Sequence, residues 1–129
     1  MYLLIDLSQR DTIDLTFFTT ETLEHKKYQR QNRELLVSIE EALTQLGVEK
    51  SAIAGIMVVV GTGSFTNTRL AVTVANTWGH ANNIPLLAIK ASQIEESQQL
   101  IPLLESQPKG QYISATYSGE PNIGKKKDA

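Results

Sequence analysis

The sequence contains no cysteine and only two histidines, His25 and His80, which lie far apart along the chain. Disulfide bonds, cysteine nucleophiles and cysteine-based zinc sites are therefore excluded. The two histidines do not have the spacing of a metal-binding pair. Aromatic residues make up only 6 % of the chain. Because cysteine is missing and the two histidines are far apart, we expect no metal ion. We expect no other cofactor either.

The chain also lacks a long apolar run and a basic surplus. No apolar stretch approaches the roughly 20 residues of a transmembrane helix, and the N-terminus lacks the pattern of a cleaved signal peptide. We therefore expect a cytoplasmic protein with no membrane partner. The net charge is −2, whereas proteins that bind nucleic acid on their own usually carry excess positive charge. Any role with RNA would run through a partner protein.

Strand-forming residues dominate the start of the chain. Residues 2–7 form an apolar run, and residues 12–19 are rich in β-branched and aromatic side chains that partly alternate with polar ones. A short loop separates these two runs, which predicts an antiparallel hairpin. Residues 20–28 are more polar, and their charged side chains are typical of an edge strand.

From residue 29 the spacing of apolar residues changes. Leu35, Ile39, Ala42 and Leu46 recur every three or four positions, which predicts an amphipathic helix over 29–46. Gly47 is placed to end it. The elements expected after it are a buried strand over 54–60, a helix over 65–82, a buried strand over 85–89 and a helix over 92–104.

This order of elements indicates the fold class. A hairpin followed by alternating strands and helices gives an α/β fold with a mixed five-stranded sheet and flanking helices. It is the order of a ribonuclease H-like domain, the repeating half of the actin-like (ASKHA) fold. We assign residues 1–108 to this single domain and residues 109–129 to a C-terminal extended segment and polar tail.

The segment between the first buried strand and the second helix reads Gly61-Thr-Gly-Ser-Phe-Thr-Asn-Thr-Arg69. Its glycines permit positive φ angles in a tight turn, and Ser64 or Thr66 can cap the helix. A helix N-terminus also attracts anions, although the segment is neither a Walker A loop nor a GxGxxG motif. A tight turn is the simpler interpretation, and a phosphate-binding loop is the alternative.

The same segment resembles the Gly-Pro-Gly-Ser-Phe-Thr-Gly-x-Arg motif of the bacterial TsaB (YeaZ) family, with Thr62 and Asn67 as departures. Ile5-Asp-Leu-Ser8 and Asn83-Ile-Pro-Leu-Leu87 resemble further family segments. Tyr117-Ser-Gly-Glu-Pro-Asn-Ile123 resembles the family's C-terminal ending. The resemblance thus implies a shortened form with most of the second actin-like half missing. The motif positions that match are Gly61, Gly63, Ser64, Phe65, Thr66 and Arg69.

This resemblance implies a function without catalysis. The chain would be a scaffold subunit that binds the catalytic protein TsaD and supports transfer of the threonylcarbamoyl group to adenosine 37 of tRNA. The resemblance further implies contact with the ATPase subunit TsaE, a homodimer when the chain is alone, and only indirect contact with tRNA. The interface would lie on the first two helices, at Arg33, Leu36, Val37, Glu40, Ala71, Thr73, Ala75 and Asn76.

Two enzyme classes are alternatives. Asp6 occupies the position of a metal-binding aspartate in ribonuclease H-like nucleases, but Gly61 stands where a second carboxylate would be needed. We therefore expect Asp6 to accept backbone N–H bonds near Ser8. A small actin-like nucleotide-binding enzyme that uses the Gly61–Thr66 turn remains the alternative function. We expect His80 to contact the last carbonyls of its own helix, and Trp78 to pack.

Overall fold

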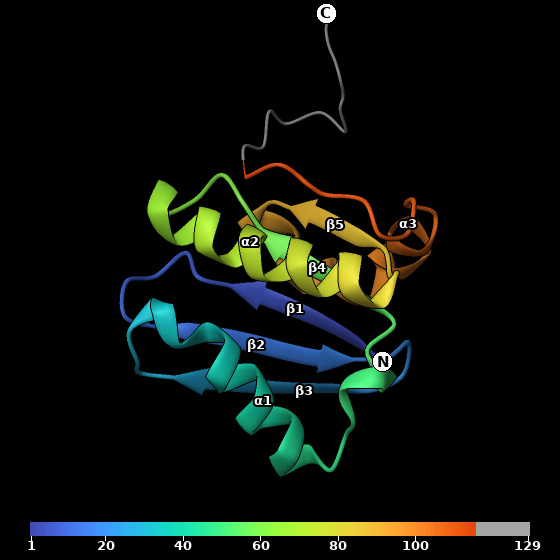
Figure 1. The fold of residues 1–129 in the computed structure, drawn as a ribbon, viewed down its shortest axis with the longest axis horizontal. Coiled ribbons are helices and arrows are strands. Elements are labelled where there is room, and N and C mark those ends of the chain that lie inside the picture. Colours follow the sequence, from blue (N-terminus) through green and yellow to red (C-terminus); the bar gives the residue numbers. More distant parts are fainter. Residues whose placement is uncertain (116–129) are drawn as a thin grey trace, which may run out of the picture.

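A five-stranded sheet runs through the structure, a computed structural model that describes residues 1–115 (Figure 1). Its strand order is β3-β2-β1-β4-β5. The antiparallel strands β1–β3 are joined by β4 and β5, which run parallel to β1. The mixed five-stranded sheet is therefore confirmed. Its strands are β1 (Tyr2–Asp6), β2 (Ile13–Phe18), β3 (Leu23–Tyr28), β4 (Gly55–Val59) and β5 (Leu86–Ile89).

The central strands are apolar on both faces. In β1, Leu3 and Ile5 point into one core cluster and Leu4 into another on the opposite face, because successive side chains of a strand alternate. Every residue of β4 is buried, as its continuous apolar run predicts. β3 is an edge strand with mostly exposed side chains, which confirms the third, polar strand.

Two helices cover one face of the sheet (Figure 1). A single 3₁₀ turn, η1 (Asn32–Glu34), leads into α1 (Leu35–Leu46), and η2 (Lys50–Ala52) leads from it to β4. Gly47 ends α1 at φ 69°. The second helix, α2 (Phe65–Asn82), has the bounds that the sequence predicts and ends at Asn83, which adopts φ 54°.

The last helical segment differs from the prediction of one α-helix over 92–104. Residues Ala91–Leu100 form a 3₁₀ segment, η3, and only Ile101–Glu105 form α3. Pro102 explains the break, because proline has no N–H and its ring clashes with the carbonyl four residues earlier in a helix interior. At the start of α3 it is tolerated. This segment covers the second face of the sheet, where Ile101 and Leu104 join the Leu4 cluster.

The chain then turns at Gly110, whose φ is 73°. Lys109 forms an isolated β-bridge with Pro85, and residues 111–115 have no regular structure. The Tyr117–Ile123 motif lies outside the described residues, and the domain division at residue 108 stays a prediction. Within residues 1–115, none of the helices is both long and apolar enough to span a bilayer.

Tyr2 ties α3 to the sheet. Its hydroxyl donates a hydrogen bond to the Glu105 carboxylate, and its ring centroid lies 5.8 Å from that of Phe18. The hydrogen bond to Glu105, partial burial and the negative charge of Glu105 raise the pKa of Tyr2 to about 12. Each of these effects disfavours the phenolate.

We expect the Tyr2→Phe substitution to remove a stabilising contribution that depends on pH. The pKa is higher in the folded than in the unfolded state, so the contribution is fully present below about pH 10 and is lost as the pH rises towards about 12. The difference in melting temperature between the native chain and Tyr2→Phe should shrink over this range. Tyr112→Phe, at an exposed tyrosine, is the control. A difference that stays constant with pH would contradict this assignment.

Candidate functional site

The Gly61–Thr66 turn carries the chain from β4 to α2. Gly61 and Gly63 have φ angles of 81° and 82°, a region that glycine adopts more readily than other residues. A Cβ atom on Gly63 would lie 2.3 Å from the carbonyl oxygen of Ser8. The loop between β1 and β2 thus lies directly against the turn, and only glycine fits at position 63.

Ser64 is the N-cap of α2. Its hydroxyl accepts a hydrogen bond from the backbone N–H of Asn67 at 3.0 Å, which satisfies one of the free N–H groups at the helix start. Thr66 is exposed and lies within the first turn of the helix. The Arg69 guanidinium lies 5.3 Å from the centroid of the Phe65 ring. Of the two candidate caps, Ser64 takes the role.

A buried asparagine holds the loop opposite this turn. Asn32 is 7 % exposed; its amide oxygen accepts a bond from the Asp11 N–H at 3.0 Å, and its amide nitrogen donates to the Thr12 carbonyl at 2.8 Å. These bonds hold Asp11 at φ 52°. Sequence reasoning did not assign Asn32 this role, because the bonds link residues 21 and 20 positions apart.

Asp6 takes its expected role, because its Oδ1 accepts the Ser8 N–H at 2.8 Å. Within residues 1–115, no group of three or more His, Asp or Glu residues could hold a metal ion. The loop and the turn border an open pocket of about 620 Å³, which is lined by Arg10, Ser64 and Thr66 among others. Arg33 lines this pocket as well, so the structure places it beside the turn rather than between the helices.

A groove of about 370 Å³ lies between α1 and α2. It brings together three of the predicted interface residues, Leu36, Glu40 and Thr73. Val37 lies outside the groove and is 61 % exposed. We call this site the helix groove; its full lining is Leu36, Glu40, Lys50, Thr73, Val74, Thr77, Trp78, Ala81 and Asn82.

Two predicted interface residues of α2 are wrong as surface positions. Ala71 and Ala75 are completely buried in the core cluster beneath the helices. They lie one turn apart on the helix face that packs against the sheet. Their small side chains therefore allow α2 to approach the sheet closely, and they do not offer a surface to a partner.

Two further residues of α2 hold the C-terminal segment. The Asn76 amide donates to the Ile113 carbonyl at 3.1 Å and accepts the Ile113 N–H at 2.8 Å, so its side chain is engaged within the chain. His80 Nδ1 lies 3.3 Å from the Gly110 carbonyl oxygen. The expectation that His80 contacts the last carbonyls of its own helix is therefore wrong.

The helix groove combines an apolar floor with a charged rim. Trp78 is 8 % exposed, and its indole N–H is buried without a hydrogen-bond acceptor in the described chain. At the rim, Lys50 Nζ lies 2.7 Å from Glu40 Oε2, and both side chains are about half exposed. Such an exposed ion pair adds little to stability, so it can separate at low cost when another surface approaches.

Comparison with known proteins identifies the family. A family model described as TsaD, tRNA N6-adenosine threonylcarbamoyltransferase, matches residues 24–115, well over half of the chain. The chain belongs to the TsaD family. No curated protein sequence matches it.

Solved structures with this fold match the TsaD-family chain. One is YeaZ from Pseudomonas aeruginosa, with a TM-score of 0.62 and 24 % identity over 69 % of this chain. Another is described as an uncharacterized protein with similarity to peptidase YeaZ from Pseudomonas aeruginosa, with a TM-score of 0.60 and 25 % identity over 70 % of this chain. The chain covers 44 % of each. The ribonuclease H-like fold and the resemblance to YeaZ (TsaB) are thereby confirmed.

We expect Gly63→Ala to destabilise the chain more than Gly47→Ala. Both glycines have positive φ, but a Cβ atom at position 47 has no atom within 4 Å, whereas at position 63 it meets the Ser8 backbone. Gly47→Ala should cost about 1–2 kcal/mol of unfolding free energy, and Gly63→Ala a further ~1–3 kcal/mol from overpacking. Urea denaturation measures both. Equal losses of unfolding free energy in the two variants would show that the β1–β2 loop does not pack tightly against the Gly61–Thr66 turn.

Proposed function

We propose that this TsaD-family chain is a non-catalytic subunit that binds TsaD through the helix groove. In this role it supports transfer of the threonylcarbamoyl group to adenosine 37 of tRNA. The observation that carries the proposal is the apolar groove between α1 and α2, in whose lining Leu36 is 46 % exposed. The family match supports the link to tRNA modification.

The chemistry of the groove supports a protein partner. Protein interfaces have an apolar centre surrounded by a polar rim, and the groove lining combines Leu36, Val74 and Trp78 with the Glu40–Lys50 pair and two threonines. Tryptophan is among the residues that contribute most to binding when a partner covers them. A groove between two helices is also a shape that accepts a third helix.

The remaining parts of the proposal follow from the same surface. The chain alone would form a homodimer by covering the groove with a second copy, and TsaD would compete with that copy. Contact with TsaE would use a surface that TsaD leaves free. The net charge of −2 supports an indirect contact with tRNA. The chain would act in the cytoplasm.

We expect Leu36→Glu to weaken binding to TsaD from the same organism at least about tenfold, because a carboxylate would be buried in the apolar groove. Thr73→Arg, at an exposed groove position, should act similarly. Leu103→Glu is the matched control, because Leu103 is 48 % exposed on α3, away from the groove. Affinities are measured on the purified proteins, with melting temperatures as a check on folding.

Two outcomes of that experiment would contradict the proposal. One is that the native chain and TsaD form no complex at micromolar concentration. The other is that Leu36→Glu and Leu103→Glu weaken the complex equally, which would indicate a general effect of added charge.

A small actin-like nucleotide-binding enzyme that uses the Gly61–Thr66 turn is the second candidate function. It is favoured by one observation, the pocket of about 620 Å³ in which Arg10 and Arg33 lie near the start of α2, since arginines and helix N-termini both attract phosphate. Titration of the native chain with ATP tests it. Tight binding that Ser64→Ala and Arg33→Ala both abolish would favour this enzyme over the scaffold.

A further inference from the structure

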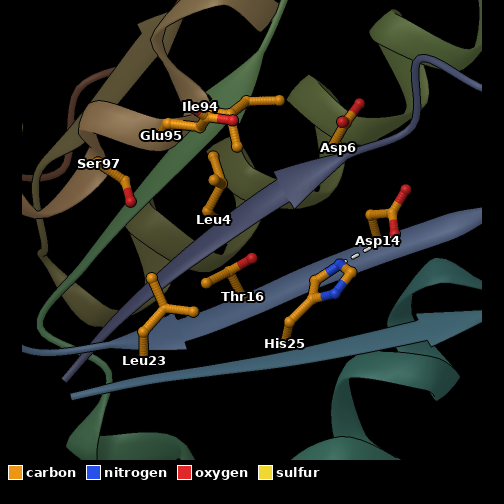
Figure 2. Close-up of a pocket in the computed structure, with 9 residues that line it drawn as sticks. All are labelled: Leu4, Asp6, Asp14, Thr16, Leu23, His25, Ile94, Glu95 and Ser97. Carbon is orange, nitrogen blue, oxygen red and sulfur yellow. Dashed lines mark hydrogen bonds and ion pairs between the residues drawn. The ribbon is translucent and has the colours of Figure 1, made fainter.

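A separate pocket of about 430 Å³ lies on the face of the sheet opposite α1 and α2 (Figure 2). It is bordered by the first three strands and by η3. We call it the sheet pocket. Its lining residues are Leu4, Asp6, Asp14, Thr16, Leu23, His25, Ile94, Glu95 and Ser97.

The strand register explains why these side chains meet. Leu4 lies opposite Thr16, and Thr16 lies opposite His25. Directly opposite residues of antiparallel strands share one face of the sheet, so these three side chains form a row across β1, β2 and β3. Asp6 lies opposite Asp14 in the neighbouring row. The sheet pocket is therefore built on rigid strands.

Two mostly buried residues of the sheet pocket carry hydroxyl groups for which no hydrogen bond is found among residues 1–115. Ser97 is 2 % exposed and Thr16 is 8 % exposed, and both line the pocket. Figure 2 shows their oxygen atoms turned toward the space between η3 and the strands. Neither oxygen is fully buried, because Trp78 Nε1 is the one fully buried side-chain nitrogen or oxygen without a partner in residues 1–115. Both hydroxyls are therefore open to the pocket and free to bind a polar group of a ligand.

The charge of the sheet pocket indicates the sign of that ligand. Asp6, Asp14 and Glu95 contribute carboxylates, and the sole basic side chain in the lining, His25, has its Nε2 3.0 Å from Asp14 Oδ1. Phosphate and carboxylate ligands would meet like charge here, whereas a cation would be attracted. A single metal ion does not fit, because no three ligating side chains of residues 1–115 converge. The carboxylates are instead spread along the pocket.

The remaining lining residues are apolar. Leu4 belongs to the strand row, Ile94 comes from η3, and Leu23 is 52 % exposed at the pocket. An alkyl chain can cover such a surface while its charged end stays near carboxylates, as lysine and arginine side chains do elsewhere in proteins. The volume of about 430 Å³ is within the range of small-molecule sites.

We propose that the sheet pocket binds an organic cation, an ammonium or guanidinium group on an alkyl stem. The stem lies over Leu23 and Ile94, and the charged group donates hydrogen bonds to Glu95 and to the Ser97 hydroxyl. The same group occurs in free polyamines and in lysine or arginine side chains of other proteins. This site is independent of the helix groove and of the function proposed for it.

Spermidine is the first probe, titrated into the full chain by calorimetry. We expect binding that weakens with added salt and weakens at least about tenfold in Glu95→Gln. Glu96→Gln is the matched control, because Glu96 is the next residue, is exposed like Glu95, carries the same charge and lies outside the pocket lining. Neutral 1,8-octanediol should not bind. Binding that Glu95→Gln and Glu96→Gln weaken equally, or no binding at millimolar spermidine, would overturn the proposal.

Ser97→Ala gives a second readout. A serine that only supports the fold would lower the melting temperature when lost, but an unpartnered hydroxyl should leave the melting temperature of the free chain unchanged and still weaken spermidine binding. A lower melting temperature with unchanged binding would contradict a ligand role. A blocked Ala-Lys-Ala peptide separates the two sources: tighter binding than spermidine identifies a protein side chain, and weaker binding identifies a free polyamine.

Discussion

The whole arrangement depends on the burial of β1 between β2 and β4. This strand is antiparallel to one neighbour and parallel to the other, and it is apolar on both faces, so each face needs a cover. The helices α1 and α2 cover Leu3 and Ile5, and η3 with α3 covers Leu4. Because the sheet separates the two layers, a surface formed by one layer is independent of a surface formed by the other.

That separation divides the chemistry of the molecule between its faces. The helix groove is apolar with a single exposed ion pair at its rim, which suits a protein partner. The sheet pocket is rich in carboxylates, which suits a cation. The pocket beside the Gly61–Thr66 turn contains two arginines and a helix start. The small net charge of −2 therefore does not reveal that the three surfaces differ in charge and polarity.

The Gly61–Thr66 turn contains the family motif and also has a role in the fold. Its glycines are required because the β1–β2 loop lies against Gly63, and its serine begins α2 by capping it. α2 then forms one wall of the helix groove. The motif therefore has a structural reason that does not depend on a bound ligand: it positions the helix on which the proposed interface lies.

Local spacing in the sequence was enough to predict the strands, α1, α2 and the ends of both helices at Gly47 and Asn83, because periodicity, glycine and capping act between near neighbours in the chain. It placed the start of α1 at residue 29, whereas the α-helix begins at Leu35. It also predicted the Asp6–Ser8 turn, and Leu36, Glu40 and Thr73 as members of one surface. It missed that the predicted helix over 92–104 is 3₁₀ before Ile101 and α-helical only from Ile101, although Pro102 is a local signal.

Other features depend on contacts between distant residues, and only the tertiary structure decided them. Ala71 and Ala75 look like any small residues on a helix, and only packing against the sheet shows that they are buried. The partners of Asn32 and Asn76 lie 20 or more positions away. The sheet pocket combines three strands with η3. The sequence by itself therefore determined the elements and the family motif. Only the tertiary structure decided which side chains face solvent, core or pocket, because burial depends on what folds against each element.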